Sequence, residues 1–124
     1  MKKTLLPLLF VVFASACIQS TSSTSPEPNT IEITSAGFNP DFLEVESGTT
    51  VTFINKDTAP HWPASAVHPT HTVYPEYDGC ISSKFDACKG LQNGESWSFT
   101  FTQLGTWKYH DHLNPSFTGK ITVK

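Results

Sequence analysis

The sequence predicts an all-β sandwich, and three observations support that fold class. Short runs in which apolar and polar residues alternate recur along the chain, at residues 31–34, 42–46, 49–55, 96–102, 106–110 and 119–124. Glycines mark turns between these runs, at Gly48, Gly94 and Gly105. The apolar spacing of an amphipathic helix is nearly absent. Many short strands separated by glycine-marked turns are typical of two sheets packed face to face.

The individual runs have the two-residue period of a half-buried strand, because successive side chains of a strand point to opposite faces. In residues 49–55, Val51 and Phe53 share one face. In residues 96–102, one tryptophan and two phenylalanines face one way and small hydroxyl residues face the other. Residues 106–110 alternate again. Each run therefore predicts a strand with one face in the core.

Residues 57–90 interrupt this pattern with a long insertion that is rich in proline and aromatic residues. A loop of this length in a compact domain is usually functional or held down. Three of the five histidines lie in this insertion and two follow a predicted strand, forming two clusters: His61, His68, His71, His110 and His112. Imidazole is the commonest protein ligand for copper, zinc and nickel. The clusters therefore predict a metal site.

The N-terminus has the pattern of an export signal. Two lysines precede a short apolar run, and small residues then lead into Cys17. The apolar run is too short to span a bilayer as a permanent helix. Small residues before a cysteine resemble the lipobox of bacterial and archaeal lipoproteins, although Ala14 stands where that pattern prefers leucine. We expect a signal peptide at residues 1–16 and a lipid on Cys17, which would anchor the protein to a membrane facing the periplasm or cell exterior. Secretion without a lipid is the alternative.

The rest of the chain divides by composition into residues 17–30 and 31–124. After Cys17, the first part is rich in serine, threonine and proline, so it predicts a flexible linker. The second part is long enough for one domain with one core, which we expect to be a monomer. Without the two signal-peptide lysines, six lysines and no arginine face eleven carboxylates, a net charge near −5. A nucleic-acid partner is therefore not expected, because phosphate binding needs a basic surface.

Cys80 and Cys88 are the two cysteines outside the processing site at Cys17. In an oxidising compartment, two cysteines that close a short loop most often form a disulfide. Chain-entropy models give about 2–3 kcal/mol for closing so short a loop. A metal thiolate from one of them is the alternative, but it would leave the other as a free thiol outside the cell. We therefore expect a disulfide.

The order of these pieces resembles the cupredoxin family over nearly all of residues 31–124. The matching segments are residues 38–40, 43–48, 51–55, 93–95, 105–109 and 119–123, together with a proline before His61. The resemblance implies a Greek-key cupredoxin-like β-sandwich, here with a long loop insertion. It also implies copper as the cofactor and electron transfer as the activity.

Most copper ligands of that family are missing. The pattern of short-loop cupredoxins of the amicyanin kind, Tyr-His-Cys-x-x-His-x-x-Met-x-Gly, aligns from Tyr109 without a gap. Its cysteine, second histidine and methionine then fall on Asp111, Asn114 and Phe117. Only His61 keeps a ligand position of the family. A blue-copper centre depends on a cysteine thiolate, so the resemblance predicts that such a centre is absent here.

One alternative places a metal between the two histidine clusters. Because side chains two apart on a strand point to the same face, His110 and His112 would converge while Asp111 turns the other way. His68 and His71 would complete an all-imidazole site from the insertion. Such a site suits Cu(II), and also suits Zn(II).

A second alternative keeps the inherited position, with His61, Asp111 and one neighbouring histidine as a nitrogen-and-oxygen set. Replacing thiolate by carboxylate favours Cu(II) or Zn(II) over Cu(I). A third alternative has no metal, and the histidines only hydrogen-bond the insertion and hold it down. The sequence leaves all three open.

The sequence therefore predicts an exported copper-binding protein with a histidine-rich, non-blue site. It would act in copper capture or electron transfer, with a redox or copper-trafficking protein as partner. The enzymatic alternative is an oxidoreductase with an open Cu(II) site, and a metal-free interaction domain is another. Binding is favoured over catalysis because the sequence shows no recognisable substrate pocket. Copper is favoured over zinc because of the family resemblance.

Overall fold

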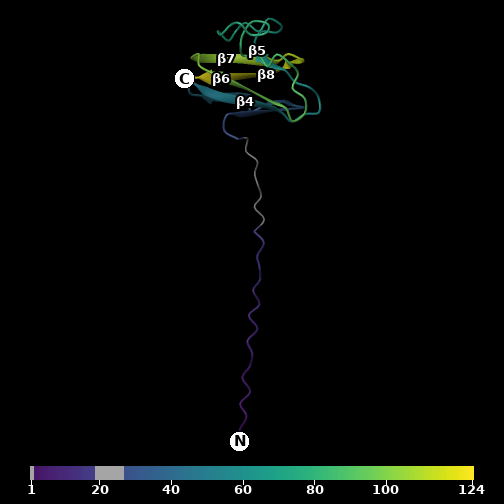
Figure 1. The fold of residues 1–124 in the computed structure, drawn as a ribbon, viewed down its shortest axis with the longest axis vertical. Coiled ribbons are helices and arrows are strands. Elements are labelled where there is room, and N and C mark those ends of the chain that lie inside the picture. Colours follow the sequence, from purple (N-terminus) through teal and green to yellow (C-terminus); the bar gives the residue numbers. More distant parts are fainter. Residues whose placement is uncertain (1, 19–26) are drawn as a thin grey trace.

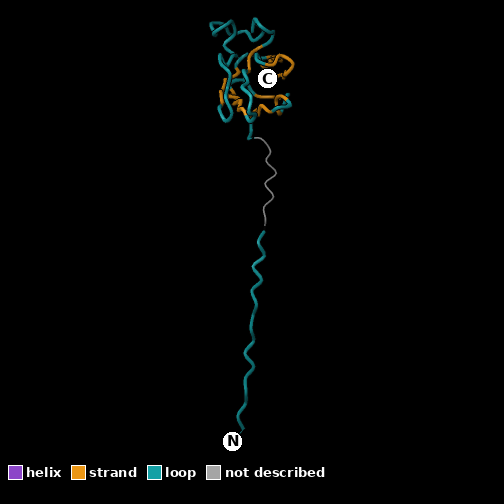
Figure 2. Tube along the Cα trace, turned by 90° about the vertical axis from the view of Figure 1, so that its right-hand side faces the viewer, coloured by secondary structure: helices purple, strands orange, loops and turns teal. Residues whose placement is uncertain are grey.

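Eight strands and no helix occur within residues 2–18 and 27–124, which the computed structural model describes. The strands are β1 (Thr30–Thr34), β2 (Gly37–Asn39), β3 (Phe42–Val45), β4 (Thr49–Asn55), β5 (Pro63–Ser65), β6 (Ser96–Phe101), β7 (Gly105–Asp111) and β8 (Asn114–Val123). They form two sheets, ordered β2-β1-β4-β6 and β3-β8-β7-β5 (Figure 1), and loops make up the rest of the domain (Figure 2). The predicted all-β sandwich is confirmed.

The two sheets mix parallel and antiparallel pairs. β1 runs parallel to β4 and β3 runs parallel to β8, while the other pairs are antiparallel. β7 and β8 form a long hairpin whose register shifts between His110 and Asp111, one step before the turn. This irregular end of the hairpin carries two of the five histidines. β5 pairs with the same end of β7 and so brings the insertion to it.

The core lies between the sheets and is rich in aromatic rings. Its buried members are Ile31, Ile33, Phe38, Val45, Val51, Phe53, Tyr74, Phe85, Leu91, Phe101, Tyr109, Ile121 and Val123. The rings of Phe53 and Tyr109 cross edge to face, 5.4 Å apart between centroids, an arrangement that adds about 0.5–1.5 kcal/mol beyond area burial. These contacts tie the two sheets together beneath the histidine-bearing end of β7.

Two aromatic residues of the insertion belong to this core and fix the insertion in place. Tyr74 and Phe85 are both fully buried. The Tyr74 hydroxyl accepts hydrogen bonds from the backbone N–H groups of Thr102 and Gln103, at 3.0 and 3.2 Å. The Ser65 N–H donates to the Phe85 carbonyl at 2.7 Å. The insertion is therefore packed against the sandwich, as a long loop in a compact domain requires.

The N-terminal region carries no secondary structure in the part that is described. Residues 2–18 form neither helix nor strand, and their side chains are exposed. Within the described residues, no helix has the length and apolar character needed to cross a bilayer. Residues 19–26 of the expected linker lie outside the described residues. The signal peptide, the linker and the lipid on Cys17 stay predictions.

Candidate metal centre

The end of β7 sends neighbouring side chains to opposite sides. Tyr109 and Asp111 are buried on the side of the sandwich interior, where the Tyr109 ring packs on Phe38 at 4.7 Å between centroids. His110 lies on the other face, and His112, just beyond the strand, turns to the same side. Side chains therefore keep alternating between the two faces of the sheet despite the register shift. His110 and His112 lie on the same face, as the all-imidazole alternative expects.

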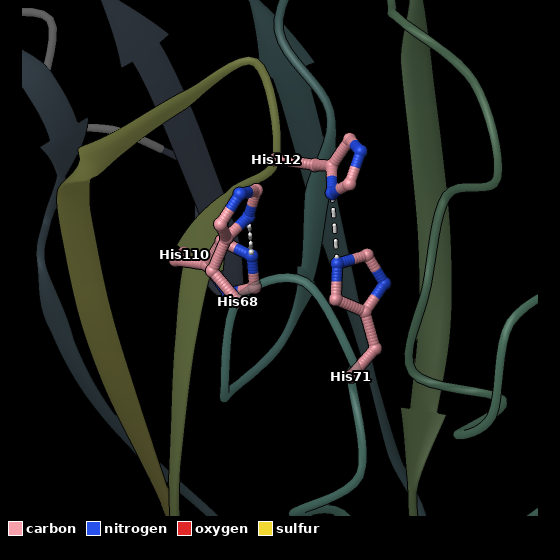
Figure 3. A group of neighbouring side chains, drawn as sticks. All are labelled: His68, His71, His110 and His112. Atoms are coloured by element: carbon pink, nitrogen blue, oxygen red, sulfur yellow. Dashed lines mark hydrogen bonds between the residues drawn. The ribbon is translucent and has the colours of Figure 1, made fainter.

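Four histidines meet on this outer face. The Nδ1 atom of His68 lies 3.3 Å from Nε2 of His110. The Nε2 atom of His71 lies 3.0 Å from Nδ1 of His112 (Figure 3). One ring nitrogen from each of the four lies within 4.8 Å of the others. We call these four residues the outer cluster.

The backbone of the insertion delivers His68 and His71 to the outer cluster. The His71 N–H donates to the Val67 carbonyl at 2.8 Å, which closes a tight turn around both histidines. His71 itself has a φ of 51°, a left-handed conformation that non-glycine residues adopt rarely. Such conformations cluster at binding and active sites. The turn is anchored to β7 because the Ala66 N–H donates to the Lys108 carbonyl at 3.0 Å.

Two members of the outer cluster, His110 and His112, favour the neutral imidazole. Burial, followed by the proximity of His71, His68 and His112, lowers the pKa of His110 from 6.5 to about 4. Burial, followed by the proximity of His71 and His68, lowers the pKa of His112 as well. At neutral pH both rings are uncharged, and each keeps one nitrogen lone pair. An uncharged imidazole is the form that binds a metal ion.

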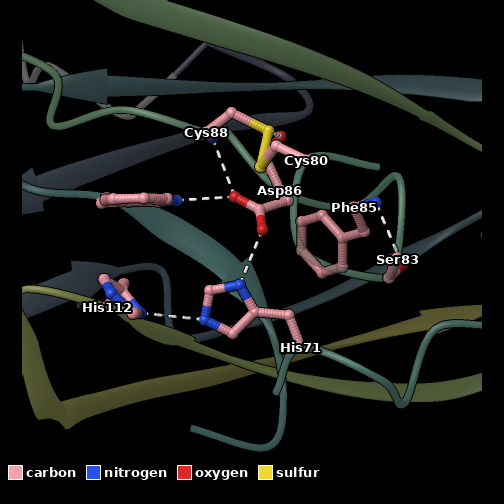
Figure 4. Close-up of a disulfide and its surroundings, with 8 residues drawn as sticks. His71, Cys80, Ser83, Phe85, Asp86, Cys88 and His112 are labelled. Atoms are coloured by element: carbon pink, nitrogen blue, oxygen red, sulfur yellow. Dashed lines mark hydrogen bonds and ion pairs between the residues drawn. A yellow bond between two sulfur atoms is a disulfide. The ribbon is translucent and has the colours of Figure 1, made fainter. Parts of the chain in front are cut away.

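Asp86 holds one histidine of the cluster in a defined orientation. Its Oδ2 atom accepts a hydrogen bond from Nδ1 of His71 at 2.6 Å, so the lone pair of His71 lies on Nε2, toward His112 (Figure 4). The Oδ1 atom accepts from the Trp62 indole at 2.6 Å and from the Cys88 N–H at 2.8 Å. A carboxylate behind a ligating histidine is typical of protein metal sites.

Asp86 was not identified from the sequence. Asp86 is the only acidic residue between the two cysteines, and its carboxylate is fully buried. Cys80 and Cys88 are joined by a disulfide with their Cα atoms 5.9 Å apart, which closes the loop around Asp86. Trp62 packs its ring on His112, 4.4 Å away between centroids. The one indication in the sequence was that Asp86 lies inside the loop that the expected disulfide between Cys80 and Cys88 closes.

The position that the resemblance assigns to a metal site, at His61, holds an ion pair instead. His61 Nδ1 contacts Asp111 Oδ2 at 2.5 Å, and His61 Nε2 contacts Asp57 Oδ2 at 2.9 Å. Burial alone would lower the pKa of His61, but the hydrogen bonds to Asp111 and then Asp57 outweigh it and raise that pKa. The Phe117 ring stacks on His61 at 5.8 Å between centroids. We call His61, Asp57 and Asp111 the inner triad.

The inner triad does not fit a copper ion in the family's manner. Both nitrogens of His61 already contact carboxylates, so neither nitrogen is free to bind a metal ion. Asp111 also accepts hydrogen bonds from the backbone N–H groups of Trp62 and Leu113, at 2.8 and 3.0 Å. Of the six side chains that the sequence nominated as metal ligands, the structure brings four together on the outer face. It places His61 and Asp111 with each other on the inner side.

Three comparisons with known proteins agree on the family. Residues 7–123 match the family model of the cupredoxin-like domain. Amicyanin of Paracoccus denitrificans is 34% identical over 84 residues, which cover 66% of this chain. The match spans 54% of that amicyanin, about half of its length.

Solved structures give the same answer for the fold. A novel purple cupredoxin from Nitrosopumilus maritimus is 25% identical with a TM-score of 0.60, over 77% of this chain and 98% of that one. A variant of amicyanin in its Cu(I) form is 26% identical with a TM-score of 0.59, over 77% of this chain and 80% of that one.

Proposed function

The chain belongs to the cupredoxin-like domain family, and we propose that it is an exported copper-binding protein whose metal lies in the outer cluster. The observation that carries this proposal is the convergence of one nitrogen from each of His68, His71, His110 and His112 within 4.8 Å. Two of these rings, His71 and His110, are buried, and four rings this close together would repel one another if protonated. The neutral rings can instead share one bound cation as ligands.

The spacing of the nitrogens suits a first-row metal ion. Metal–nitrogen bonds of about 2.0–2.1 Å put neighbouring ligands of one ion roughly 3–4 Å apart. The contacts of 3.0 Å between His71 and His112 and 3.3 Å between His68 and His110 lie in that range. Small side-chain shifts would bring all four nitrogens onto one ion.

The donor set favours copper in its oxidised form. Four imidazoles offer nitrogen ligands and no sulfur, which suits Cu(II) better than Cu(I). Copper(II) also binds nitrogen sites more tightly than the other divalent first-row ions, zinc included. A site without thiolate or thioether binds the two oxidation states of copper unequally. Copper capture is therefore the role that this chemistry supports best, with electron transfer as the role that the family suggests.

The protein's own residues have separate tasks in this proposal. His71, held by Asp86, is the pre-oriented ligand. Trp62 covers His112 and shields that side of the site from water. His68 is the exposed member of the cluster and lies where an ion would enter or leave. The same position suits contact with a copper-trafficking or redox partner.

Export and membrane attachment are part of the same proposal. The pattern of residues 1–16 supports export, and the disulfide between Cys80 and Cys88 suits an oxidising compartment. A lipid on Cys17 would tether the domain to a membrane surface through the linker. Copper arriving from outside the cell would then meet the outer cluster at that surface.

Titration of the metal-free protein with Cu(II), followed by electron paramagnetic resonance, tests the proposal. We expect one bound equivalent with a nitrogen-rich, weakly absorbing spectrum that His110→Ala abolishes. Asn114→Ala is the matched control, because Asn114 stands where the family has a histidine ligand but lies outside the outer cluster. Loss of binding in the control and not in His110→Ala would contradict the proposal, as would the absence of stoichiometric binding.

A further inference from the structure

A cavity of about 480 Å³ lies beside the outer cluster, on the outer face of β7 and β8. His68 and His110 form part of its wall, and Lys108, Lys120 and Asp41 line it as well. The cavity is therefore a charged space that borders two of the four proposed ligands. The function proposed above does not use it.

The outer cluster has a closed side and an open side. His71 and His112 do not line the cavity, and their rings contact Asp86 and Trp62 instead. His68 and His110 lie between that closed side and the cavity. Since His68 is exposed and lines the cavity with His110, a small molecule in the cavity can approach an ion held by the four rings from that side.

The two lysines of the cavity face each other without a carboxylate between them. Lys108 and Lys120 are direct partners in the register of β7 and β8. Like charges directly opposite in a sheet are destabilising. Among the ion pairs of residues 2–18 and 27–124, neither lysine takes part in one. The Lys120 ammonium instead lies 5.1 Å from the centre of the Phe42 ring.

The charge of the cavity is opposite in sign to that of the whole chain. Two lysines and one carboxylate, Asp41, give it a net positive charge, whereas the chain has a formal net charge of −3. An unpaired lysine pair of this kind is stabilised by an anion between the two ammonium groups. A cation in the outer cluster would attract the same anion.

We propose that the cavity binds a small anion, such as a carboxylate, which adds a ligand to the metal ion from the side of His68 and His110. This inference rests on the metal site proposed above. Lys108 and Lys120 hold the anion by charge, and the open side of the cluster gives it access to the ion. Asp41 opposes its binding. The proposal extends the role of the site from holding a metal ion to holding a metal–anion pair.

Azide and formate are suitable probes, because both are small anions and azide bound to Cu(II) gives a charge-transfer absorption band. Each is titrated into the full Cu(II)-loaded protein at low ionic strength. We expect saturable binding that Lys108→Gln and Lys120→Gln each weaken by about 1.5- to 5-fold, the range for one exposed charge pair. Asp41→Asn should strengthen it. Lys56→Gln, an exposed lysine outside the cavity, is the charge-matched control.

The outcomes separate this inference from the proposed metal site. If the protein binds no Cu(II), the metal site fails. If Cu(II) binds normally but azide and formate leave its spectrum unchanged, the anion site is wrong. Equal weakening by Lys56→Gln and the two cavity variants would also overturn it, because only the overall charge would then matter. Thr118→Phe, which fills the cavity from an exposed strand position, should block azide while leaving the resting copper spectrum intact.

Discussion

The inner triad and the outer cluster use the same side chain for opposite purposes. His61 lies between two carboxylates, which raise its pKa and favour the charged imidazole. His110 lies among other histidines and is buried, which lowers its pKa and favours the neutral ring. A charged imidazole binds carboxylates and no metal, whereas a neutral one offers a lone pair. The neighbours of each histidine therefore decide whether it supports the fold or a ligand site.

The end of β7 explains how both regions arise from one short segment. Asp111 points inward to His61, while His110 and His112 point outward to the insertion. Asp111, which the resemblance aligns with a cysteine ligand, thus forms an ion pair with His61. In the proposed metal site, the adjacent histidines place the ligands on the opposite face of the same sheet. The comparison predicts that changes in the inner triad affect stability and changes in the outer cluster affect metal binding.

The largest expected effect is the loss of stability in Asp111→Ala. Removing one partner of a buried ion pair costs about 3–5 kcal/mol, because the other charge is left without compensation. The backbone N–H groups of Trp62 and Leu113 would also lose their acceptor. Chemical denaturation of the metal-free protein measures this change. Asp57→Asn, which alters the half-buried partner of His61, should lose clearly less, and an equal loss in both would contradict the central role of Asp111.

The next effect is the stabilisation that a metal ion provides. A ligand that binds only the folded state adds about 2.7 kcal/mol at a hundredfold excess over its dissociation constant. We expect Cu(II) to raise the thermal unfolding midpoint of the wild-type protein and to leave that of His71→Ala unchanged. Removal of the ion with a chelator should restore the metal-free midpoint. A similar shift in both proteins would place the ion elsewhere.

A smaller effect is expected for Asp86→Asn. Loss of a carboxylate that orients a metal-binding histidine typically lowers metal affinity by about 10–100-fold. Competition with a chelator of known affinity measures the change. Asp78→Asn alters an exposed acid of the same insertion and should leave affinity unchanged. A double Cys80→Ser and Cys88→Ser variant should weaken binding in the same direction as Asp86→Asn, since the closed loop holds the carboxylate behind His71.

The smallest expected effects concern pH in the metal-free protein. The raised pKa of His61 contributes stability that is fully present below about pH 6.5, its unfolded value, and is lost as pH rises through the folded pKa. The lowered pKa of His110 acts on the acid side, where stability falls from about pH 6.5 toward pH 4 because the unfolded chain binds the proton more readily. Denaturation midpoints measured from about pH 4 to above pH 6.5 should show both changes of stability with pH. His110→Ala should reduce the acid slope alone.

The sequence predicted the longer strands because each has a two-residue period over at least four residues, although it placed the start of β8 at residue 119 instead of Asn114. It missed β2 and did not locate β5, since three residues are too few to show a period. The same alternation predicted that His110 and His112 share a face and Asp111 does not. The approach of His68 and His71 depends on how Tyr74 and Phe85 seat the insertion in the core, which no local pattern reveals. The contact between Asp86 and His71 also depends on this packing, so no local pattern predicted it.

The most direct test of the account compares Cu(II) titrations of two variants by calorimetry. In the first, His61→Gln and Asp111→Asn together remove the inner ion pair but keep similar volumes and hydrogen-bonding groups. In the second, His71→Gln removes one outer ligand. A metal site on the outer face predicts one equivalent of copper with near wild-type affinity in the first variant. In the second variant it predicts that copper affinity falls by at least about 100-fold, which is more than the effect of losing the Asp86 carboxylate alone. Copper binding that fails in the first variant and survives in the second would contradict a metal site on the outer face.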